Sequence, residues 1–518
     1  MMLPIKNISA SHKTEFYITT TLPYANSRPH LGHALEFVVS DAIARWQRLL
    51  GKEVYFLSGT DEHGAKIARA AQASGKKIKE FVDENALLFK KLIEILDIST
   101  DDFIRTSDQK RHFPGAQVLW RKFESSGDIY KKNYEGFYCV GHEAFVTQKD
   151  LINGKCADHG QAPEVIEEEN YFFRLSKYTD LIRRAIASDD FKIYPQTRKN
   201  EILSFLDQGL QDLSFSRPVK DMAWGIPVPG DATQTMYVWA DALSNYITAL
   251  GFGSADLTRF KKFWPADLQI CGKDNLRFHA AIWPGMLLSA GLALPKALLV
   301  HGFITSGGQK MSKTLGNVAD PLNLTDRCGA DALRYYLLSE ISVFEDSDFS
   351  QDRFDEVYNS RLANGLGNFI SRVAQMAANY FPEGFAKPLP QSLAEVPMEK
   401  QTTLQFFIDS LVWPNYKEAM AKYELKSAID GVWRLLHMLD SYIQTYEPFK
   451  LIKTDPEKTK AVLWNLIYGA LSAAWMIKPF MPGTSEKIFK IFGLDPSSQK
   501  EWLNIKVKPA KPLFPRKD

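Results

Sequence analysis

The feature that most constrains the fold is an alternation of apolar strands and amphipathic helices near the start of the chain. From Phe16 the sequence reads FYITT, a loop, a long helical segment and EVYFL, followed by another loop and helix. Apolar residues recur at helical spacing from Leu31 to Leu50, and Gly51 supplies a stop. This order predicts a parallel α/β sheet.

The α/β pattern stops and later returns, which divides the chain. LQICGKD, a helix from about Leu276 and the strand ALLVHGFIT resume it, so the segment between is predicted to be an insertion. After about Phe349 the chain is helical and rich in aromatic residues, as in a helix bundle. The predicted order is an α/β domain over 1–126, an insertion over 127–222, the second half of the α/β domain over 223–299, a linking region over 300–348, and an all-α domain over 349–518.

Composition and termini exclude several classes of protein. The 518 residues, 45% of them hydrophobic, suffice for more than one core. Only 4 cysteines occur, which argues against a disulfide framework and for a reducing compartment. Apolar runs such as residues 280–294 are short and broken by Pro284, and no signal peptide is recognisable. We expect a soluble, cytoplasmic protein without a membrane partner.

Two histidines stand at the predicted start of the first long helix. His30 and His33 flank Gly32 directly after Pro29, a residue suited to the first helical turn. Backbone N–H groups and the helix dipole favour an anion there, with phosphate as the obvious candidate. Gly32 leaves room for a flat group such as a purine. From these residues alone, histidines that merely cap a loop are the simpler interpretation.

A second basic element follows a later strand. The segment GGQKMSKTLGN places Lys310 and Lys313 in a glycine-rich loop. Two lysines on such a loop can hold a polyphosphate and neutralise charge as it develops. The alternative is an exposed basic turn.

HLGH after the first strand and KMSKT after a late strand together resemble the paired signatures of class I aminoacyl-tRNA synthetases, with Thr314 at a usual serine. TLPYANSRPHLGH, FLSGTDEHG, YVWADALSNY, GKDNLRFHAAIWPGML and NSRLANGLGNF resemble the methionyl-tRNA synthetase family along nearly the whole chain. The resemblance implies a Rossmann-type catalytic domain, an inserted connective knuckle domain and a helical anticodon-binding domain.

The resemblance also implies the reaction. ATP with Mg²⁺ would activate L-methionine to methionyl adenylate, and methionine would pass to the terminal adenosine of tRNA(Met), including the initiator. No protein nucleophile is required, so positioning and charge neutralisation would carry catalysis. Acid–base chemistry is the rival role for His30 and His33. Short family members suggest a monomer.

Site residues follow from the same resemblance. A thioether is polarizable and forms almost no hydrogen bonds, so aromatic rings suit its pocket. Asn275 departs from the apolar residue expected beside the GKD turn. The implied catalytic residues are His30, His33, Lys310 and Lys313; ATP would be held by these with Gly32, Gly272 and Asp274; methionine would be held by Thr21, Leu22, Tyr24, Trp239, Ala242 and His279, with Asp61 on its ammonium.

The predicted insertion carries a candidate metal site. Cys139, His142, Cys156 and His159 form two C-x₂-H pairs, the spacing of a structural zinc knuckle. Family members usually have cysteine where His142 stands. A degenerate knuckle held by packing is therefore the alternative to one structural Zn²⁺.

The helical domain carries two candidate anticodon residues. Unpaired bases are recognised by stacking on aromatic rings and by reading of their edges. Phe449, in YEPFK, stands where the family has a stacking tryptophan, and Asn364, in RLANGLGN, could read a base edge. An asparagine within a helix can equally be structural.

Three other classes of protein share some of these sequence features. Leucine, isoleucine and valine enzymes of the class carry larger editing insertions, and a cysteine enzyme would keep zinc ligands near its substrate pocket. A small nucleotidyltransferase would lack the helical bundle. A non-catalytic, zinc-stabilised tRNA-binding protein would keep the bundle but lose His30, His33, Asp61 or Lys313, and all four are present.

Overall fold

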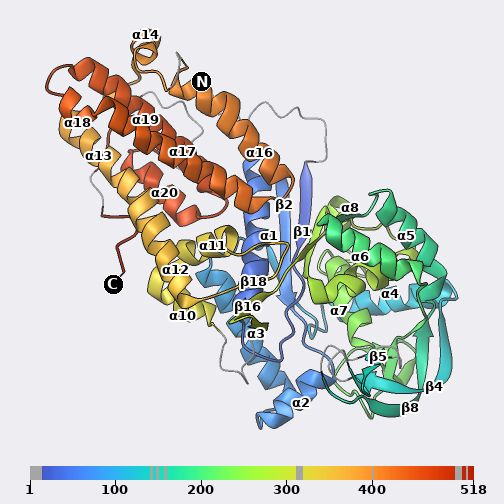
Figure 1. Ribbon diagram of the computed structural model, residues 1–518. Coiled ribbons are helices and arrows are strands. Elements are labelled where there is room, and N and C mark those ends of the chain that lie inside the picture. The colour runs from blue at the N-terminus through green and yellow to red at the C-terminus, as the bar shows by residue number, and fades with distance from the viewer. Residues whose placement is uncertain are drawn as a thin grey trace.

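The centre of the molecule is a parallel sheet of six strands, with the order β3-β2-β1-β14-β15-β9. The computed structural model describes residues 14–139, 144–146, 151–156, 160–310, 319–398, 402–495, 504–508 and 511–517. Figure 1 shows the sheet between a helical bundle and a smaller β-rich unit. The strands are β1 (Glu15–Thr19), β2 (Glu53–Thr60), β3 (Asp102–Arg105), β9 (Lys192–Tyr194), β14 (Leu268–Gly272) and β15 (Ala297–His301).

Helices cover both faces of this sheet. Successive residues along its strands point to opposite faces, and nearly all of them are buried. Phe16 and Ile18 contribute to one apolar core, and Tyr17 between them contributes to the other. The long first helix ends as predicted, with Gly51 at φ 85°. The first core includes α1 (Leu31–Leu49), α3 (Ile78–Ile95) and α11 (Ala330–Ser339); the second includes α4 (Phe113–Ser125), α5 (Thr179–Ala187), α6 (Gln196–Asp207), α7 (Val238–Thr248), α8 (Thr258–Phe263), the π-helix η5 (Phe278–Ile282) and α9 (Trp283–Ser289).

The predicted insertion is only partly a separate unit. It builds an antiparallel sheet with the order β10-β8-β4-β5, but β9 from the same segment pairs with β15 at the edge of the main sheet. The buried Arg217–Glu168 ion pair, 2.6 Å, joins β11 to β8. The strands are β4 (Ile129–Cys139), β5 (Ala144–Val146), β6 (Leu151–Ile152), β7 (Lys155–Cys156), β8 (Glu164–Phe173), β10 (Leu213–Ser214), β11 (Ser216–Pro218), β12 (Pro227–Val228) and β13 (Asp231–Met236).

The C-terminal helices form the predicted bundle, and its core is continuous with the core over one face of the sheet. α19 is the one helix in the described residues long and apolar enough to cross a membrane, yet 89% of its apolar window is buried. It is the central helix of the bundle (Figure 1). The helices are α12 (Gln351–Val357), the π-helix η7 (Tyr358–Gly367), α13 (Asn368–Tyr380), α14 (Pro390–Ala394), α15 (Leu404–Phe407), the π-helix η8 (Ile408–Val412), α16 (Trp413–Ala421), α17 (Leu425–Tyr446), α18 (Pro448–Leu451), α19 (Pro456–Ile477) and α20 (Pro482–Ile491).

A buried arginine joins the helical bundle to a helix of the main sheet. Arg334 in α11 is fully buried and lies 2.7 Å from the carboxylate of Asp41 in α1. Its guanidinium also donates to the carbonyls of Phe480, 2.7 Å, and Pro479, 2.9 Å, between α19 and α20. Burial alone would raise the pKa of Asp41, but Arg334 and Arg45 outweigh it and lower that pKa. The helix that begins at His30 therefore has a fixed position relative to the bundle.

Candidate active site

The strand order defines a crevice at the carboxyl ends of β1 and β14. The chain moves outward from β1 through β2 to β3 in one direction, and from β14 to β15 in the other. Open α/β sheets bind ligands where the strand order reverses in this way. Segments far apart in sequence meet there: the loop after β1 with Thr21, Leu22 and Tyr24, the turn after β2 with Asp61, and the turn after β14 with Asp274.

The histidine turn forms a capping box at the start of α1. His30 is the N-cap residue, so Pro29 lies one residue before the cap and not in the first turn as predicted. Nδ1 of His30 accepts from the backbone N–H of Gly32, 3.1 Å, and Nδ1 of His33 accepts from that of His30, 3.2 Å. The two rings stack with centroids 3.8 Å apart. Because each Nδ1 accepts a hydrogen bond, each neutral ring carries its proton on Nε2.

This arrangement favours hydrogen-bond donation over acid–base chemistry. Burial, together with the nearby rings of His30 and His301, lowers the pKa of His33 well below its ordinary value. A neutral imidazole with Nδ1 engaged offers an Nε2–H donor, which suits phosphate oxygens. A Cβ on Gly32 would lie 2.9 Å from Cε1 of His30. Gly32 thus leaves room for the folded-back His30 ring, and the purine contact stays a prediction.

Aromatic rings from two elements form the candidate methionine pocket. Trp239 at the start of α7 stacks on Phe278 in η5, with centroids 3.7 Å apart and planes at 12°. Both are half-buried, and Leu22 and Tyr24 pack against the same core. Ala242, one helical turn after Trp239, is buried. Leu22, Tyr24 and Trp239 therefore pack against the same core, and the methionine role of these residues and of Ala242 stays a prediction.

His279 is buried within hydrogen-bond distance of a tyrosine that the sequence did not single out. Its Nδ1 donates to the carbonyl of Asn275, 3.0 Å, so its Nε2 accepts from the Tyr246 hydroxyl, 2.7 Å. Burial lowers the pKa of His279 to about 4, although the Asn275 carbonyl opposes this. The imidazole is consequently neutral near pH 7, which suits an uncharged substrate side chain.

Asp61 lies beside Tyr24 at the edge of this region. The two residues form a parallel bridge, in which the backbone N–H of Asp61 donates to the carbonyl of Pro23, 2.9 Å. The carboxylate is 6% exposed and accepts from the hydroxyl of Thr106, 3.2 Å. A buried carboxylate next to an aromatic pocket is chemically suited to a substrate ammonium group.

A buried charge network joins the Asp61 turn to the pocket helix. One carboxylate oxygen of Asp241 lies 2.6 Å from Nδ1 of His63, and the other lies 2.7 Å from Nε2 of His112. Nδ1 of His112 lies 2.8 Å from the hydroxyl of Thr248. Burial alone would raise the pKa of Asp241, but the two histidines outweigh it and lower that pKa. His63 is two residues from Asp61, so the network fixes that turn against α7.

The candidate ribose region contains a second buried pair. A Cβ on Gly272 would lie 2.8 Å from the carboxylate of Asp274 and 3.5 Å from the ring of His301, so these three residues are adjacent. Nε2 of His301 lies 2.9 Å from Glu36, whose other oxygen accepts from the hydroxyl of Thr21, 2.5 Å. Burial would lower the pKa of His301, but Glu36 outweighs it and raises that pKa. The hydroxyl of Thr21 is thus directed at α1.

The first of the two lysines lies in a strand and not in the loop. β17 (Gln309–Lys310) pairs with β16 (Ile304–Ser306), and β16 pairs in parallel with β18 (Ser347–Asp348) on its other side. Gly307 and Gly308 have φ of 63° and 73°, as a tight hairpin turn requires. Their N–H groups donate to Asp348. Lys313 lies outside the described residues. The linking region continues with α10 (Pro321–Cys328).

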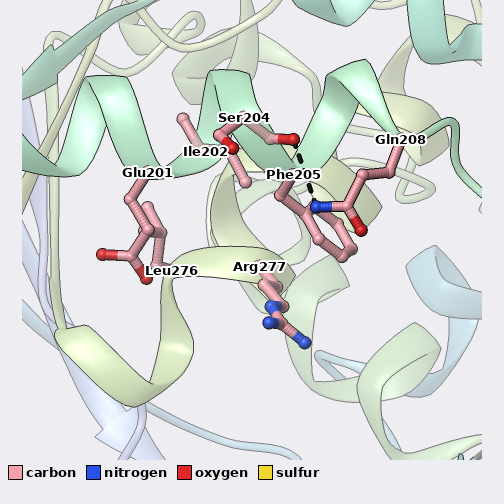
Figure 2. A pocket seen from close by; sticks show the side chains of 7 residues that line it. All are labelled: Glu201, Ile202, Ser204, Phe205, Gln208, Leu276 and Arg277. Atoms are coloured by element: carbon pink, nitrogen blue, oxygen red, sulfur yellow. Dashed lines mark hydrogen bonds between the residues drawn. The ribbon is translucent and has the colours of Figure 1, made fainter. Parts of the chain in front are cut away.

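A separate cavity of about 220 Å³ lies behind the turn that carries Asp274. Figure 2 shows side chains of α6 facing Leu276 and Arg277. The Arg277 guanidinium lies 4.6 Å from the ring centroid of Phe205, a cation–π contact. The 3₁₀ turn η4 (Lys273–Asn275) immediately precedes this contact. No residue predicted to bind methionine or ATP lines the cavity, so it is distinct from the candidate active site.

Half of the predicted metal set falls in the described residues. Cys139 and Cys156 are buried in one small cluster with Phe137 and Leu151 nearby. His142 and His159 lie outside the described residues, so the prediction of zinc stays a prediction.

The two candidate anticodon residues lie on different elements. Asn364 in η7 is exposed, and its Oδ1 accepts from Nε of Arg516, 2.8 Å. Phe449 in α18 is 41% exposed. Figure 1 places α18 at the end of the bundle away from the sheet. Phe449 is thus accessible for stacking, whereas Asn364 is engaged by the C-terminal segment.

Sequence reasoning missed several residues of the site. Tyr246 was within reach, because it follows Trp239 and Ala242 on the same helical face at seven and four residues. Phe278 adjoins the predicted His279. The Glu36–His301 pair and the Asp241 network join segments separated by 265 and up to 178 residues, so no local pattern could indicate them.

Comparison with known proteins agrees with this geometry. The family model described as tRNA synthetases class I (M) matches residues 16–156 and 146–374. The methionine–tRNA ligase of Caldanaerobacter subterraneus subsp. tengcongensis is 41% identical over 517 residues, covering 98% of this chain and 79% of that protein. The methionine–tRNA ligase of Brucella melitensis biotype 1 is 39% identical over 517 residues, covering 97% and 98% of the two chains.

Solved structures show the same architecture. Mycobacterium tuberculosis methionyl-tRNA synthetase in complex with methionyl-adenylate is similar with a TM-score of 0.90 and 36% identity, covering 97% of this chain and 100% of that chain. The free form of that enzyme is similar with a TM-score of 0.84 and 32% identity, covering 98% and 99%. The predicted fold class, a class I α/β domain followed by helices, is therefore confirmed. The chain belongs to the methionyl-tRNA synthetase family of the class I aminoacyl-tRNA synthetases.

Proposed function

We propose that both steps of the methionine–tRNA ligase reaction take place at the crevice between β1 and β14. The chain is a methionine–tRNA ligase that uses ATP. It forms methionyl adenylate and pyrophosphate, then transfers methionine to the 3′ terminal adenosine of tRNA. The assignment of individual residues to these steps is our proposal.

One observation carries the assignment: the Asp241–His63 contact joins the turn that carries Asp61 to helix α7, whose Trp239 stacks on Phe278. Trp239 and Phe278 offer polarizable faces to a thioether, and neutral His279 adds no charge to the pocket. Asp61 would hold the ammonium group. The carboxylate of the substrate would then point towards the start of α1.

In the first step, a carboxylate oxygen of methionine attacks the α-phosphorus of ATP, and the bond to the bridging oxygen of pyrophosphate breaks. His30 and His33 would donate hydrogen bonds from Nε2–H to phosphate oxygens. This step requires no proton transfer by either histidine. Lys310 and Lys313 would neutralise the charge that accumulates on the leaving pyrophosphate. Mg²⁺ bound to the ATP phosphates would supply further neutralisation.

In the second step, a ribose hydroxyl of the terminal tRNA adenosine attacks the carbonyl carbon of methionyl adenylate, and AMP leaves. Gly272 and Asp274 would hold the ribose of the adenylate, with the Glu36–His301 pair behind them. The helical bundle would bind the anticodon of tRNA(Met), the initiator included, with Phe449 as a stacking surface.

A structural Zn²⁺ in the inserted unit fits the donor chemistry that is described. Two buried thiols lie together in a small cluster with little core of its own. Cys139 and Cys156 would supply two thiolates, and His142 and His159 the remaining ligands. We further propose that the enzyme acts as a cytoplasmic monomer.

Methionine-dependent exchange of pyrophosphate into ATP tests the proposed roles. Replacement of Lys313 by alanine should reduce exchange at least about a hundredfold, the range for loss of one charge that stabilises the transition state. Methionine binding, measured by equilibrium dialysis, should remain. Unchanged exchange in this variant would remove the role of the lysine segment, and exchange driven by another amino acid would remove the pocket assignment.

A further inference from the structure

The described parts of the C-terminal segment, residues 504–508 and 511–517, are basic but contact the bundle closely. Its strand β20 (Asn504–Ile505) pairs with β19 (Phe385–Ala386), and the N–H of Lys508 donates to the carbonyl of Ile491, 2.8 Å. Phe514 is 7% exposed and meets the ring of Tyr358 edge-on. Both described parts of the segment are therefore held against the helical domain, and Figure 1 shows the C-terminal end beside α12.

The last residues of the segment are held as tightly. Asn359 and Lys517 exchange two hydrogen bonds of 3.0 Å, and Nζ of Lys517 donates to the carbonyl of Arg327. Arg516 donates to Asn364, 2.8 Å. Main-chain and apolar contacts thus anchor the segment at both ends, while Lys506, Lys508 and Lys511 remain exposed.

The segment and α20 together enclose a groove of about 340 Å³. Its apolar lining includes Ile491 and Leu513, and four lysines also line it: Lys487 and Lys490 from α20, Lys508 and Lys511 from the segment. Lys490 also pairs with Glu486, 2.5 Å, on its own helix. Four ammonium groups around one groove repel each other, which destabilises the free protein slightly. An anionic partner would remove that repulsion.

We propose that this groove binds the sugar–phosphate backbone of tRNA, as a docking surface outside the catalytic crevice and the anticodon residues. The proposal rests on the proposed function, because tRNA is the polyanionic substrate of that reaction. Lysine is a flexible point charge, suited to phosphates whose sequence need not be read. The surface would contribute tRNA affinity without contacting methionine or ATP.

Counterion release gives the proposal a quantitative signature. Each phosphate neutralised by a lysine contributes about 0.7–0.9 to the slope of log affinity against log salt concentration. The double variant Lys487→Gln, Lys490→Gln should reduce that slope by about 1.4–1.8 and raise the KM for tRNA roughly tenfold near 0.1 M salt. Lys508→Gln with Lys511→Gln should act similarly.

The matched control is Lys261→Gln with Lys262→Gln in α8. It also removes two exposed lysines from one helix, one of them paired, since Lys262 lies 2.5 Å from Glu53. Glu53 begins β2, so this site is at the opposite end of the sheet from the crevice. Its KM for tRNA should stay within about twofold of wild type, the scale of nonspecific charge effects.

Aminoacylation and pyrophosphate exchange are then measured for every variant. The proposal is supported if the groove variants lose tRNA affinity and salt dependence while methionine-dependent exchange, which needs no tRNA, is unchanged. It is overturned if the KM for tRNA and its salt slope match wild type, or if the control loses as much. Absence of exchange in the wild type would instead overturn the proposed function.

Discussion

The replacement Asp241→Asn tests the coupling between the Asp61 turn and the methionine pocket. Asp241 accepts from His63, 2.6 Å, and from His112, 2.7 Å, and all three side chains are buried. On α7, Asp241 and Thr248 face this network, whereas Trp239 stacks on Phe278 and Tyr246 hydrogen-bonds to His279. The network therefore sets the rotation of the helix that carries the pocket.

The magnitude follows from the lost interactions. Asparagine keeps one acceptor oxygen but turns an amide N–H₂ towards the second imidazole N–H. A hydrogen bond to a charged group contributes about 1.5–3 kcal/mol, so the free energy of unfolding should fall by about 3 kcal/mol. If half of this loss appears in substrate binding, the KM for methionine rises roughly tenfold, which corresponds to about 1.4 kcal/mol.

The assay is pyrophosphate exchange with methionine and ATP varied separately, alongside thermal unfolding. We expect the KM for ATP to stay within about twofold and kcat to fall less than the KM for methionine rises. The control Glu168→Gln breaks the buried Arg217–Glu168 pair, 2.6 Å, in the inserted unit, and should destabilise without changing the KM for methionine. An unchanged KM for methionine in Asp241→Asn would show that the network is only structural.

Three further predictions concern the caps, the pH dependence and the metal. His30→Ala should cost about 1 kcal/mol of stability through the lost N-cap and reduce the kcat of exchange, with chemical denaturation and exchange as the measurements. Because Glu36 raises the pKa of His301, the stability of this pair is fully present below the ordinary histidine pKa and is lost as pH rises through the raised value. A Tm profile should show this loss in the wild type, and a profile unchanged by His301→Gln would contradict it. Elemental analysis should find one zinc per chain, abolished by Cys139→Ser or Cys156→Ser; a metal-free wild type that folds normally with chelator would contradict this.

Local patterns sufficed for the parts of the fold that are defined locally. The helix after His30 and the strand containing Cys271 were predictable because apolar spacing, a proline and a glycine mark their ends. The roles assigned to Trp239, Ala242 and Asp61 remain predictions.

Long-range contacts determine the other features of the fold and the site, and no local sequence pattern indicates these contacts. β9 joins the edge of the main sheet through pairing with β15, although it lies within the predicted insertion. Lys310 lies in β17 because Asp348, 41 residues away from Gly307, holds the hairpin turn. Arg334 pairs with Asp41 of α1 and reaches the bundle through the carbonyls of Phe480 and Pro479, which any residue could supply. Each of these features depends on a contact between residues that are far apart in sequence and meet only in the folded chain.

A crystal structure with a non-hydrolysable analogue of methionyl adenylate tests the central claim most directly. We expect the thioether between Trp239 and His279, the ammonium on Asp61, and the ribose beside Asp274, with the phosphate analogue at the start of α1. An analogue bound in the cavity beside Arg277, or one whose ammonium lies away from Asp61, would contradict the assignment.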